Sequence, residues 1–513
     1  MDEFYLCAMR RVRVRFAPSP TGGLHLGGVR TALFNYLFAH QHGGDFVLRV
    51  EDTDRTRFVE GAEQYIIDCL KWAGISPDES PAHGGSYGPY RQSERKELYR
   101  QFAERLVADG HAYYAFDTPE EIEALRERLK SEGKENLQYG HQSRMLMKNS
   151  LTLTEAQTQE LLKSNTPHVI RIKVEPGINI KFTDLVRGEI EMSTDTVDDK
   201  VLLKADGMPT YHLAVVVDDH QMKISHAFRG EEWLPSAPVH VLLYKYLGWE
   251  SEMPCWAHFP LILKPDGNGK LSKRDGQRLG FPVFAMEWND PNLGLIAGFR
   301  ELGFLPQAFI NMLAMLGWND GTGKEIFSLG EMVDAFRIDR VHSHGAKFDF
   351  EKAKWFNHEW IMKLEANELV SYVLPWYEKE GYDVSDKDVV KSIITMVKDR
   401  CTLLSDFIPQ SSFFFKKPEV QIGLINGKWN EKKTAFFKTL IEKWTAMEAW
   451  IHEDLEHSFK AIASEMEIKP GELLLPLRVM LVGGKFGPGV FDISAILGKK
   501  ETLERIQAAL GML

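Results

Sequence analysis

The first fifty residues pass from an alternating pattern to a helical one and back to an apolar run. Val12, Val14 and Phe16 alternate with arginines, as in a half-buried strand, and prolines end the run. Apolar positions then recur at the spacing of one helix face over residues 29–37, and FVLRV at residues 46–50 predicts a second strand. A strand, a glycine-rich loop, a helix and a strand form a βαβ unit, so the pattern predicts a parallel sheet at the start of the chain.

The middle of the chain mixes charged helical stretches with apolar runs. Residues 95–165 are charged and mostly helical in pattern, and the segments between residues 168 and 220 alternate as strands. The run LAVVVDD at residues 213–219 is apolar without interruption and ends in two acids, so we expect a buried strand there. The sheet is then expected to resume after an insertion of about 120 residues, which splits the first domain.

Beyond residue 350 the strand pattern nearly disappears. The segments at residues 387–407 and 501–513 carry apolar side chains at helical spacing. This pattern predicts a helical attachment on an α/β domain.

Composition agrees with a folded protein of several domains. The chain has 513 residues, 44% of them hydrophobic and 26% charged, which is too long for one ordinary core and predicts two to four domains. The net charge of −11 gives no overall attraction for nucleic acid, although a basic groove can coexist with it. The four cysteines lie far apart, and no apolar run approaches the roughly 20 residues of a membrane span. We expect a cytoplasmic protein in which residues 1–10 are a short extension.

The glycine-rich loop before the first helix is a candidate phosphate site. In TGGLHLGG, Gly27 and Gly28 would let a nucleotide lie against the backbone, and His25 would point at its phosphates. An ordinary loop with an incidental histidine fits this segment equally well. Neither a P-loop nor a GxGxxG motif occurs in the chain.

A second loop carries a cluster of cations. The segment KLSKRDG at residues 270–276 places three cations within five residues, a pattern suited to the charge that develops on a leaving pyrophosphate. A solvated charged turn is the commoner fate of such a cluster.

Acids and arginines near the predicted strand ends could bind a polar ligand. Glu51 follows the second strand, and Asp218 and Asp219 end the run LAVVVDD. Ligands of parallel sheets bind at the carboxyl ends of the strands, although acids there also serve as turn formers. Arg15 and Arg229 lie beside the same strands, and an arginine fork suits a carboxylate.

Six motifs together resemble one family. In order they are RFAPSPTGGLHLGG, RVEDTDRTR, GPYRQSER, YHLAVVVDDH, RGEEW and KLSKRDG. In sequence and order they are similar to the signatures of bacterial-type glutamyl-tRNA synthetases, and the resemblance covers nearly the whole chain from residue 11. It implies a class I aminoacyl-tRNA synthetase that activates L-glutamate with ATP, brought as its Mg²⁺ complex, and transfers the glutamyl group to the terminal ribose of tRNA(Glu). In this family activation characteristically requires bound tRNA.

The resemblance also implies site residues. HLGG and KLSKR match the two signature loops of the class, which makes His25, Lys270 and Lys273 the expected catalytic residues. The residues expected to bind glutamate are Arg15, Ala17, Ser19, Glu51, Tyr211, Val215 and Arg229. Those expected to bind ATP are His25, Gly27, Gly28, Glu232, Leu263, Lys270, Leu271, Ser272, Lys273 and Arg274, and those expected at the anticodon are Arg400, Pro488 and Val490.

Two positions depart from the family pattern. Gly28 replaces the final histidine of its signature, and Val215 stands where the family usually has asparagine, which removes a polar group from the expected glutamate pocket. No cysteine cluster exists for the zinc of some relatives, and the histidines at residues 452 and 457 are five apart instead of four, so we expect neither structural zinc nor another metal site.

The expected fold is multidomain, α/β plus all-α: a Rossmann-like parallel-sheet catalytic domain with an α/β insertion, then a stem-contact region and helical anticodon-binding domains. The expected boundaries are 1–94 and 216–260 for the catalytic halves, 95–215 for the acceptor-end insertion, 261–365 for the stem-contact domain, and 366–421 and 422–513 for the helical domains. We expect a monomer that contacts no membrane.

Two alternatives remain. The first is a non-discriminating enzyme that also charges tRNA(Gln). The resemblance disfavours it, because Arg400 matches the arginine that discriminating enzymes of the family place against the third anticodon base, where an arginine can read a base edge with two hydrogen bonds. The second is a small-molecule nucleotidyltransferase without an RNA substrate, which offers no reason for nearly 150 helical residues at the end of the chain.

Overall fold

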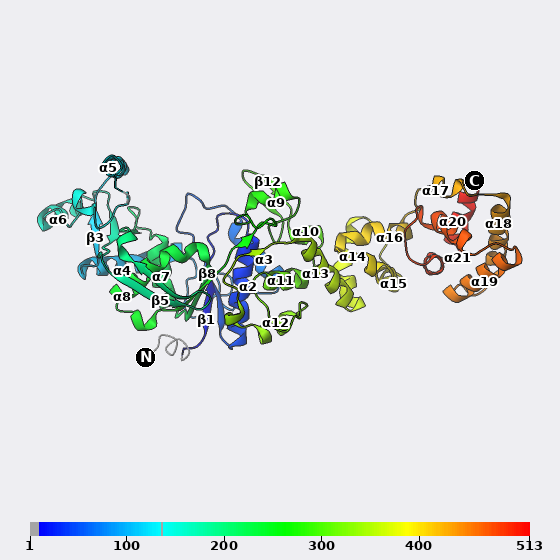
Figure 1. Cartoon of the computed structure of the whole chain (residues 1–513), viewed down its shortest axis with the longest axis horizontal. Coiled ribbons are helices and arrows are strands. Elements are labelled where there is room, and N and C mark those ends of the chain that lie inside the picture. Colours follow the sequence, from blue (N-terminus) through cyan, green and yellow to red (C-terminus); the bar gives the residue numbers. More distant parts are fainter. Residues whose placement is uncertain (1–9, 135–136) are drawn as a thin grey trace. The chain divides into compact units, whose positions relative to one another are not determined.

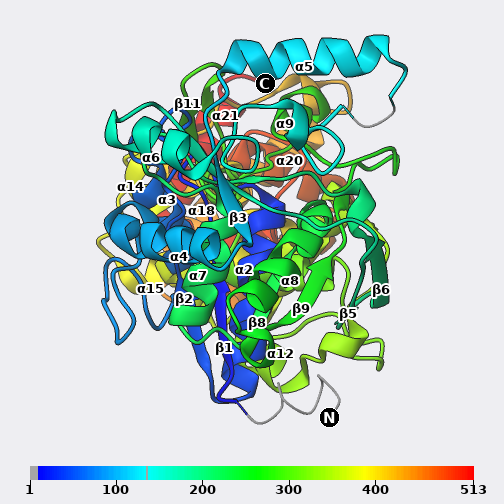
Figure 2. The same cartoon turned by 90° about the vertical axis from the view of Figure 1, so that its left-hand side faces the viewer.

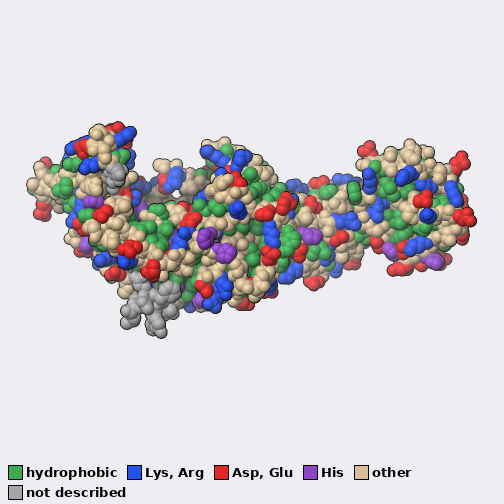
Figure 3. All heavy atoms as spheres, viewed as in Figure 1, with side chains coloured by type: hydrophobic (Ala, Val, Ile, Leu, Met, Phe, Trp, Pro, Cys, Tyr) green, Lys and Arg blue, Asp and Glu red, His purple; other side chains and the backbone are tan. Residues whose placement is uncertain are grey.

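The structure is a computed structural model that describes residues 10–134 and 137–513. Most of the extension predicted for residues 1–10 therefore lies outside the described residues. The chain divides into two compact units, one formed by Met1–Phe299 and Phe309–Phe350, the other by Arg300–Ala308 and Glu351–Leu513. No described helix is long and apolar enough to cross a membrane. Acidic and basic side chains are interspersed over the face seen in Figure 3.

The first unit is built on a six-stranded sheet of order β2-β1-β8-β9-β5-β6. All neighbours pair parallel except the β5–β6 hairpin, and Figure 2 shows the six strands side by side. Its strands are β1 (Arg13–Phe16), β2 (Asp45–Leu48), β5 (Asn179–Asp184), β6 (Gly188–Ser193), β8 (His226–Gly230) and β9 (Cys255–Phe259). The predicted βαβ start is confirmed, with α2 (Leu26–Gln41) between β1 and β2.

The segment between the halves of this sheet has a sheet of its own. The antiparallel strands β3 (Ala112–Ala115), β4 (Val169–Ile172) and β7 (Val201–Leu203) form it. A small core beside it joins Tyr113 and Ala115 to Leu125 and Leu129. The hairpin β5–β6 comes from the same part of the chain but pairs with β9, so it widens the main sheet.

Helices and two short pairs of strands, β10 with β13 and β11 with β12, complete the described part of this unit (Figure 1). The helices are α3 (Ala62–Trp72), α4 (Lys96–Ala108), α5 (Pro119–Ser131), α6 (Glu155–Lys163), α7 (Tyr211–Gln221), α8 (Ala237–Tyr246), α9 (Lys273–Leu279), α10 (Phe299–Leu302), α11 (Pro306–Met315) and α12 (Leu329–Ala335), of which α10 and α11 cross the division between the units. The short strands are β10 (Ile262–Leu263), β11 (Trp288–Asp290), β12 (Gly294–Ile296) and β13 (Ala346–Lys347).

The strand predicted for LAVVVDD is wrong, because these residues form helix α7. Five consecutive apolar side chains from Leu213 to Val217 are at most 3% exposed, since α4, β7 and α8 pack around the helix. A helix buried on every side has no polar face, so its sequence looks like that of a buried strand. Asp218 and Asp219 consequently lie near the end of a helix and not at a strand end.

The second unit is helical throughout its described residues, as predicted. Its helices are α13 (Phe350–Lys363), α14 (Ala366–Lys379), α15 (Lys387–Val397), α16 (Phe407–Phe415), α17 (Gly423–Asn426), α18 (Glu431–Ala446), α19 (His452–Glu465), α20 (Gly471–Val482) and α21 (Val490–Leu510). The last four share a core that includes Phe436, Trp444, Phe459 and Leu477.

Candidate functional site

A cleft of about 580 Å³ lies at the carboxyl ends of β1 and β8, where parallel sheets bind ligands. The loop after β1, the first turn of α2, the start of α7 and the segment before α9 also line it. The predicted site residues that it brings together are Arg15, Ala17, Ser19, His25, Gly27, Gly28, Glu51, Tyr211, Val215, Arg229, Glu232, Lys270, Leu271 and Ser272. Segments more than 200 residues apart in the chain thus meet in one cavity.

Three predicted residues are placed differently. Leu263 and Arg274 are not among the described residues that line the cleft, although Leu263 pairs with Lys270 in an isolated β-bridge. Lys273 begins α9, and its side chain lies outside the described part of the structure. Within the described residues, no three His, Cys, Asp or Glu side chains gather so that they could hold a metal ion.

His25 caps the N-terminus of α2. Its backbone is extended, and its Nδ1 accepts the N–H of Gly27 at 3.2 Å. Because Nδ1 acts as an acceptor, the proton of the neutral ring is on Nε2. The histidine therefore presents a ring N–H beside the backbone N–H groups of a helix start, which is a suitable arrangement for phosphate oxygens.

The cationic loop reaches the cleft through Lys270. Its Nζ lies 2.7 Å from Oε1 of Glu232, in the turn after β8, and both side chains are about half exposed, at 52% and 41%. Leu271 next to it is fully buried, and Ser272 caps α9 together with Asp275. An anchored backbone thus carries a lysine that is paired with an exposed acid.

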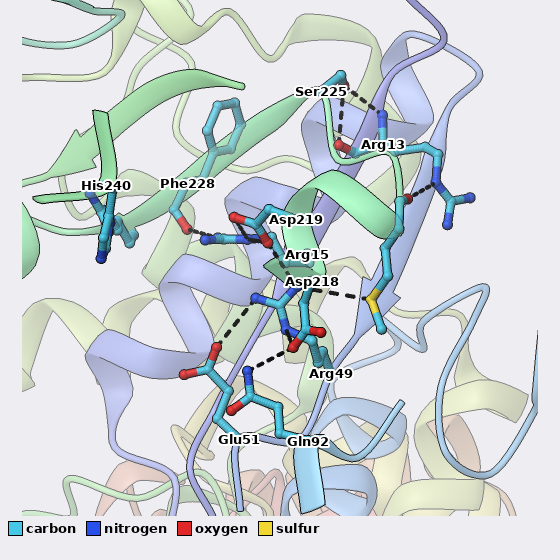
Figure 4. Close-up of polar contacts among 12 residues, drawn as sticks. Arg13, Arg15, Arg49, Glu51, Gln92, Asp218, Asp219, Ser225, Phe228 and His240 are labelled. Atoms are coloured by element: carbon cyan, nitrogen blue, oxygen red, sulfur yellow. Dashed lines mark hydrogen bonds and ion pairs between the residues drawn. The ribbon is translucent and has the colours of Figure 1, made fainter. Parts of the chain in front are cut away.

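Arg15 at the inner end of the cleft is paired with a carboxylate. Its Nε donates to the two oxygens of Asp219 at 3.0 and 3.2 Å, and its Nη1 donates to the carbonyl of Phe228 at 3.1 Å (Figure 4). Both charged residues are less than a tenth exposed. Asp219, which also pairs with Arg49, therefore places a negative charge directly against this arginine.

Arg229 makes its hydrogen bonds with uncharged groups. Its Nε donates to His258 at 2.9 Å, and its Nη1 donates to the hydroxyl of Tyr211 at 3.0 Å and to His240 at 3.1 Å. The ring of Trp256 lies 4.5 Å from its Cζ. The two arginines that the sequence suggested as a fork thus differ in how far their charge is balanced.

Glu51 is a buried acid in the same part of the cleft. Burial raises its pKa to about 7, although Arg49 and Arg15 oppose the rise. Nη2 of Arg49 lies 3.3 Å from its Oε1. A ligand ammonium beside Glu51 would favour the ionised form of this carboxyl.

The sequence alone did not identify Arg49 as the buried cation that supports the inner end of the cleft. Arg49 is fully buried just after β2, where its guanidinium faces Glu51, Asp218 and Asp219 (Figure 4). Asp218 also accepts hydrogen bonds from the side chains of Gln92, Arg95 and Tyr99. The available signal was an arginine inside the apolar run FVLRV, since a buried cation requires acidic partners.

In the helical unit, the structure brings the predicted anticodon residues near each other. Arg400 ends a short turn after α15 and is exposed, while Val490 at the start of α21 is buried. Arg478, which the sequence reading missed, donates from Nη1 to the carbonyls of Gly487 and Pro488. Burial and the neighbouring Arg400 lower the pKa of Arg478, which shows that the two segments are close.

Comparisons with known proteins cover nearly the whole chain. Residues 11–355 match the family model described as the catalytic domain of class I tRNA synthetases (E and Q), and residues 368–510 match an anticodon binding domain. The chain is 48% identical over 507 residues to a glutamate–tRNA ligase of Parabacteroides distasonis, which covers 98% of this chain and 99% of that protein. It is 49% identical to one of Flavobacterium johnsoniae, over 98% and 100% of the two chains.

A solved structure of a glutamate tRNA ligase is also similar to this chain. A glutamate tRNA ligase from Elizabethkingia meningosepticum, crystallised in complex with its amino acid, superposes with a TM-score of 0.93 at 45% identity and covers 98% of this chain and 100% of that chain.

Proposed function

The chain belongs to the class I tRNA synthetases for glutamate and glutamine and is a glutamate–tRNA ligase, and on that premise we propose how its cleft divides the reaction. The inner end binds L-glutamate, and the end formed by α2 and the cationic loop binds ATP. The observation that best supports this division is that buried Arg15, Glu51 and Arg229 share one cavity with the start of α2 and with Lys270.

The first step needs no covalent intermediate with the protein. The α-carboxylate of glutamate attacks the α-phosphorus of ATP, and pyrophosphate leaves as glutamyl-adenylate forms. His25 donates its Nε2 proton to phosphate oxygens as a hydrogen bond, and Lys270 and Lys273 stabilise the charge that develops on the pyrophosphate. Mg²⁺ enters with ATP as part of that substrate.

Lys270 changes partner when ATP binds. In the structure its ammonium is paired with Glu232 at 2.7 Å, and both groups are about half exposed. Exposed ion pairs contribute only about 0–1 kcal/mol, so a polyphosphate displaces the carboxylate at little cost. The remaining residues of the predicted ATP site, Gly27, Gly28, Leu263, Leu271, Ser272 and Arg274, would contact ATP mainly through the backbone or at the rim.

Glutamate is bound by charge at both of its ends. Glu51 accepts the substrate ammonium, and the arginines with Tyr211 bind carboxylate, while Ala17, Ser19 and Val215 shape the space between. A site built around charge rejects a neutral amide of the same size far better than a site built on shape.

For the RNA substrate we propose a discriminating enzyme. Arg400 reads the third anticodon base, supported by Pro488 and Val490, and the inserted residues 95–215 hold the acceptor end. We further propose that the protein works as a cytoplasmic monomer, with tRNA(Glu), L-glutamate and ATP as its partners.

The test is ATP–pyrophosphate exchange with glutamate, followed by charging of tRNA(Glu) and tRNA(Gln). We expect exchange only in the presence of tRNA(Glu), and charging of tRNA(Glu) alone. Exchange at the same rate without tRNA would contradict tRNA-dependent activation, and equal charging of both tRNAs would show a non-discriminating enzyme. In Arg400→Gln we expect the preference for tRNA(Glu) to fall about tenfold, while Lys398→Gln in the same turn serves as a control.

A further inference from the structure

One donor of Arg229 is left over for a ligand. The residue is 5% exposed and lines the cleft, yet its Nη2 has no hydrogen-bond partner among the described residues. The other guanidinium nitrogens are engaged by His258, Tyr211 and His240. A buried cation with a spare N–H in a cavity is expected to bind an anion there.

The first of these histidines is oriented by a carboxylate from the β5–β6 hairpin. His258 Nδ1 lies 2.5 Å from Oδ2 of Asp184, and both side chains are completely buried. Oδ1 of Asp184 accepts the backbone N–H groups of Val186 and Arg187, each at 3.0 Å, so the turn of the hairpin fixes the carboxylate. The proton of His258 is therefore on Nδ1, and its Nε2 is free to accept from Arg229.

The second histidine is also an acceptor toward Arg229. His240 Nδ1 receives the Nη1 proton, which places its own proton on Nε2, 3.2 Å from Nδ1 of His212. Burial lowers the pKa of His240 and His258, and it lowers the pKa of His212 to about 4. All three rings are thus neutral near pH 7, and none of them cancels or repels the charge of Arg229.

We propose that Asp184 and His258 are positioning residues for recognition of the substrate anion. They hold the guanidinium of Arg229 by its Nε, which leaves Nη2 without a hydrogen-bond partner among the described residues beside the cleft. Because they do this through a neutral ring, the full positive charge remains for a carboxylate. This inference rests on the proposed binding of glutamate in the cleft. It deepens that proposal by assigning the selection of a carboxylate over an amide to the chain of contacts from Asp184 through His258 to Arg229, which we call the relay.

The comparison with Arg15 shows why the relay matters. Asp219, which also pairs with Arg49, contacts Arg15 directly and so places a negative charge against that guanidinium. A carboxylate in direct contact with Arg229 would reduce its attraction for glutamate in the same way. An imidazole placed between Asp184 and the guanidinium keeps the orientation and moves the negative charge one ring farther away.

The test compares three variants in steady-state charging of tRNA(Glu). In His258→Leu the Nε contact is lost, and we expect the KM for glutamate to rise about tenfold, with the KM for ATP unchanged within twofold. In His258→Gln the carboxamide can accept from Arg229 and donate to Asp184, so we expect most of the affinity to return. Asp184→Asn should raise the KM for glutamate in the same way as His258→Leu.

The matched control is His226→Gln. His226 is another buried histidine, at the opposite end of β8, and its Nδ1 lies 2.9 Å from the hydroxyl of Ser225, while its ring packs edge-to-face with Phe228. We expect its kinetic constants for glutamate and ATP to stay within twofold of wild type. The ratio of glutamine to glutamate charging should rise in His258→Leu and not in this control.

Three results would overturn the relay. One is a folded His258→Leu protein with an unchanged KM for glutamate, and another is failure of His258→Gln to improve on it. The third is a parallel loss of affinity for ATP and glutamate with a lowered Tm, which would indicate a structural role. If His258→Leu does not fold, the KM for glutamate measured in Asp184→Asn and His258→Gln tests the relay in its place. Failure of the wild-type protein to charge tRNA(Glu) would instead contradict the proposed function.

Discussion

The two ends of the cleft are built on different principles. At the inner end Arg15, Glu51 and Arg229 are all less than a tenth exposed, and fixed hydrogen bonds hold them before a ligand arrives. At the outer end Lys270 is half exposed and paired with Glu232, an acid that is itself partly in solvent. The inner end is thus organised for selection, whereas the outer end exchanges one weak partner for another.

This difference has an energetic reason. Replacing a buried charge leaves its former partners without compensation in a region of low dielectric constant, which costs several kcal/mol. When an exposed charge is replaced, water solvates its former partner. The loss is then the electrostatic attraction between the cation and the charge that develops in the transition state. Substitutions at the inner end should therefore change recognition of glutamate, and those at the outer end should change the rate of the chemical step.

The largest effect is expected from Arg229→Gln. Loss of the uncompensated cation should lower kcat/KM for glutamate about 1000-fold, as for a truncated buried ion pair. Steady-state charging assays would measure this. Arg11→Gln, which removes an exposed arginine paired with Asp45, is the control and should have an effect below twofold. A loss of less than tenfold in Arg229→Gln would mean that the charge of this arginine does not select the substrate.

The next effect is expected from Lys270→Met. The methionine keeps much of the side-chain stem but removes the charge, so kcat for ATP–pyrophosphate exchange should fall about 100-fold while the KM for glutamate stays within twofold. Lys245→Met, at an exposed position on α8, is the matched control. A KM for glutamate that rises as much as kcat falls would contradict the separation of the two ends.

A smaller effect is expected from pH, through Glu51. Its pKa is raised to about 7 by burial, so the carboxylate needed for the substrate ammonium forms only as pH rises through 7. The KM for glutamate should therefore fall roughly tenfold between pH 6 and pH 8. In Glu51→Gln the KM should be high at both pH values. A flat profile for the wild-type protein would contradict the assigned role.

The same shift predicts a change in stability. Because the pKa of Glu51 in the folded protein lies above its ordinary value of 4.5, its stabilising contribution is fully present below pH 4.5 and is lost as pH rises through about 7. At pH 8 the buried carboxylate should cost roughly 3 kcal/mol. Glu51→Gln should then have a higher free energy of unfolding than wild type at pH 8 and nearly the same value at pH 4.5, as measured by urea unfolding.

The smallest effect is expected from Glu232→Gln. This substitution removes an exposed partner of Lys270, and such pairs contribute at most about 1 kcal/mol, so the KM for ATP should change by no more than about fivefold. Added salt should reduce the difference from wild type further, because salt screens exposed charges. A change above tenfold would show that Glu232 contributes to ATP binding beyond its pairing with Lys270.

The start and the end of the fold could be predicted from local patterns. Alternation before the first loop, helical spacing after it and the helical pattern beyond residue 350 correspond to β1, α2 and the helical unit. The pattern failed at α7, because its five buried apolar residues present no polar face. The sequence predicts that His25 points at the phosphates of a nucleotide. It does not predict that the histidine side chain accepts the N–H of Gly27, because that hydrogen bond depends on the backbone geometry at the start of the helix.

By itself, then, the sequence determined the βαβ start, the helical end and the two loops that carry His25 and Lys270, because each depends on residues that are neighbours in the chain. Only the tertiary structure decided how the buried charges are paired. Arg15 meets Asp219 across 204 positions, while Arg229 meets His258, which Asp184 orients from 74 positions away. No local pattern records which of two arginines keeps its charge free, since that depends on which side chains the fold brings within hydrogen-bonding distance.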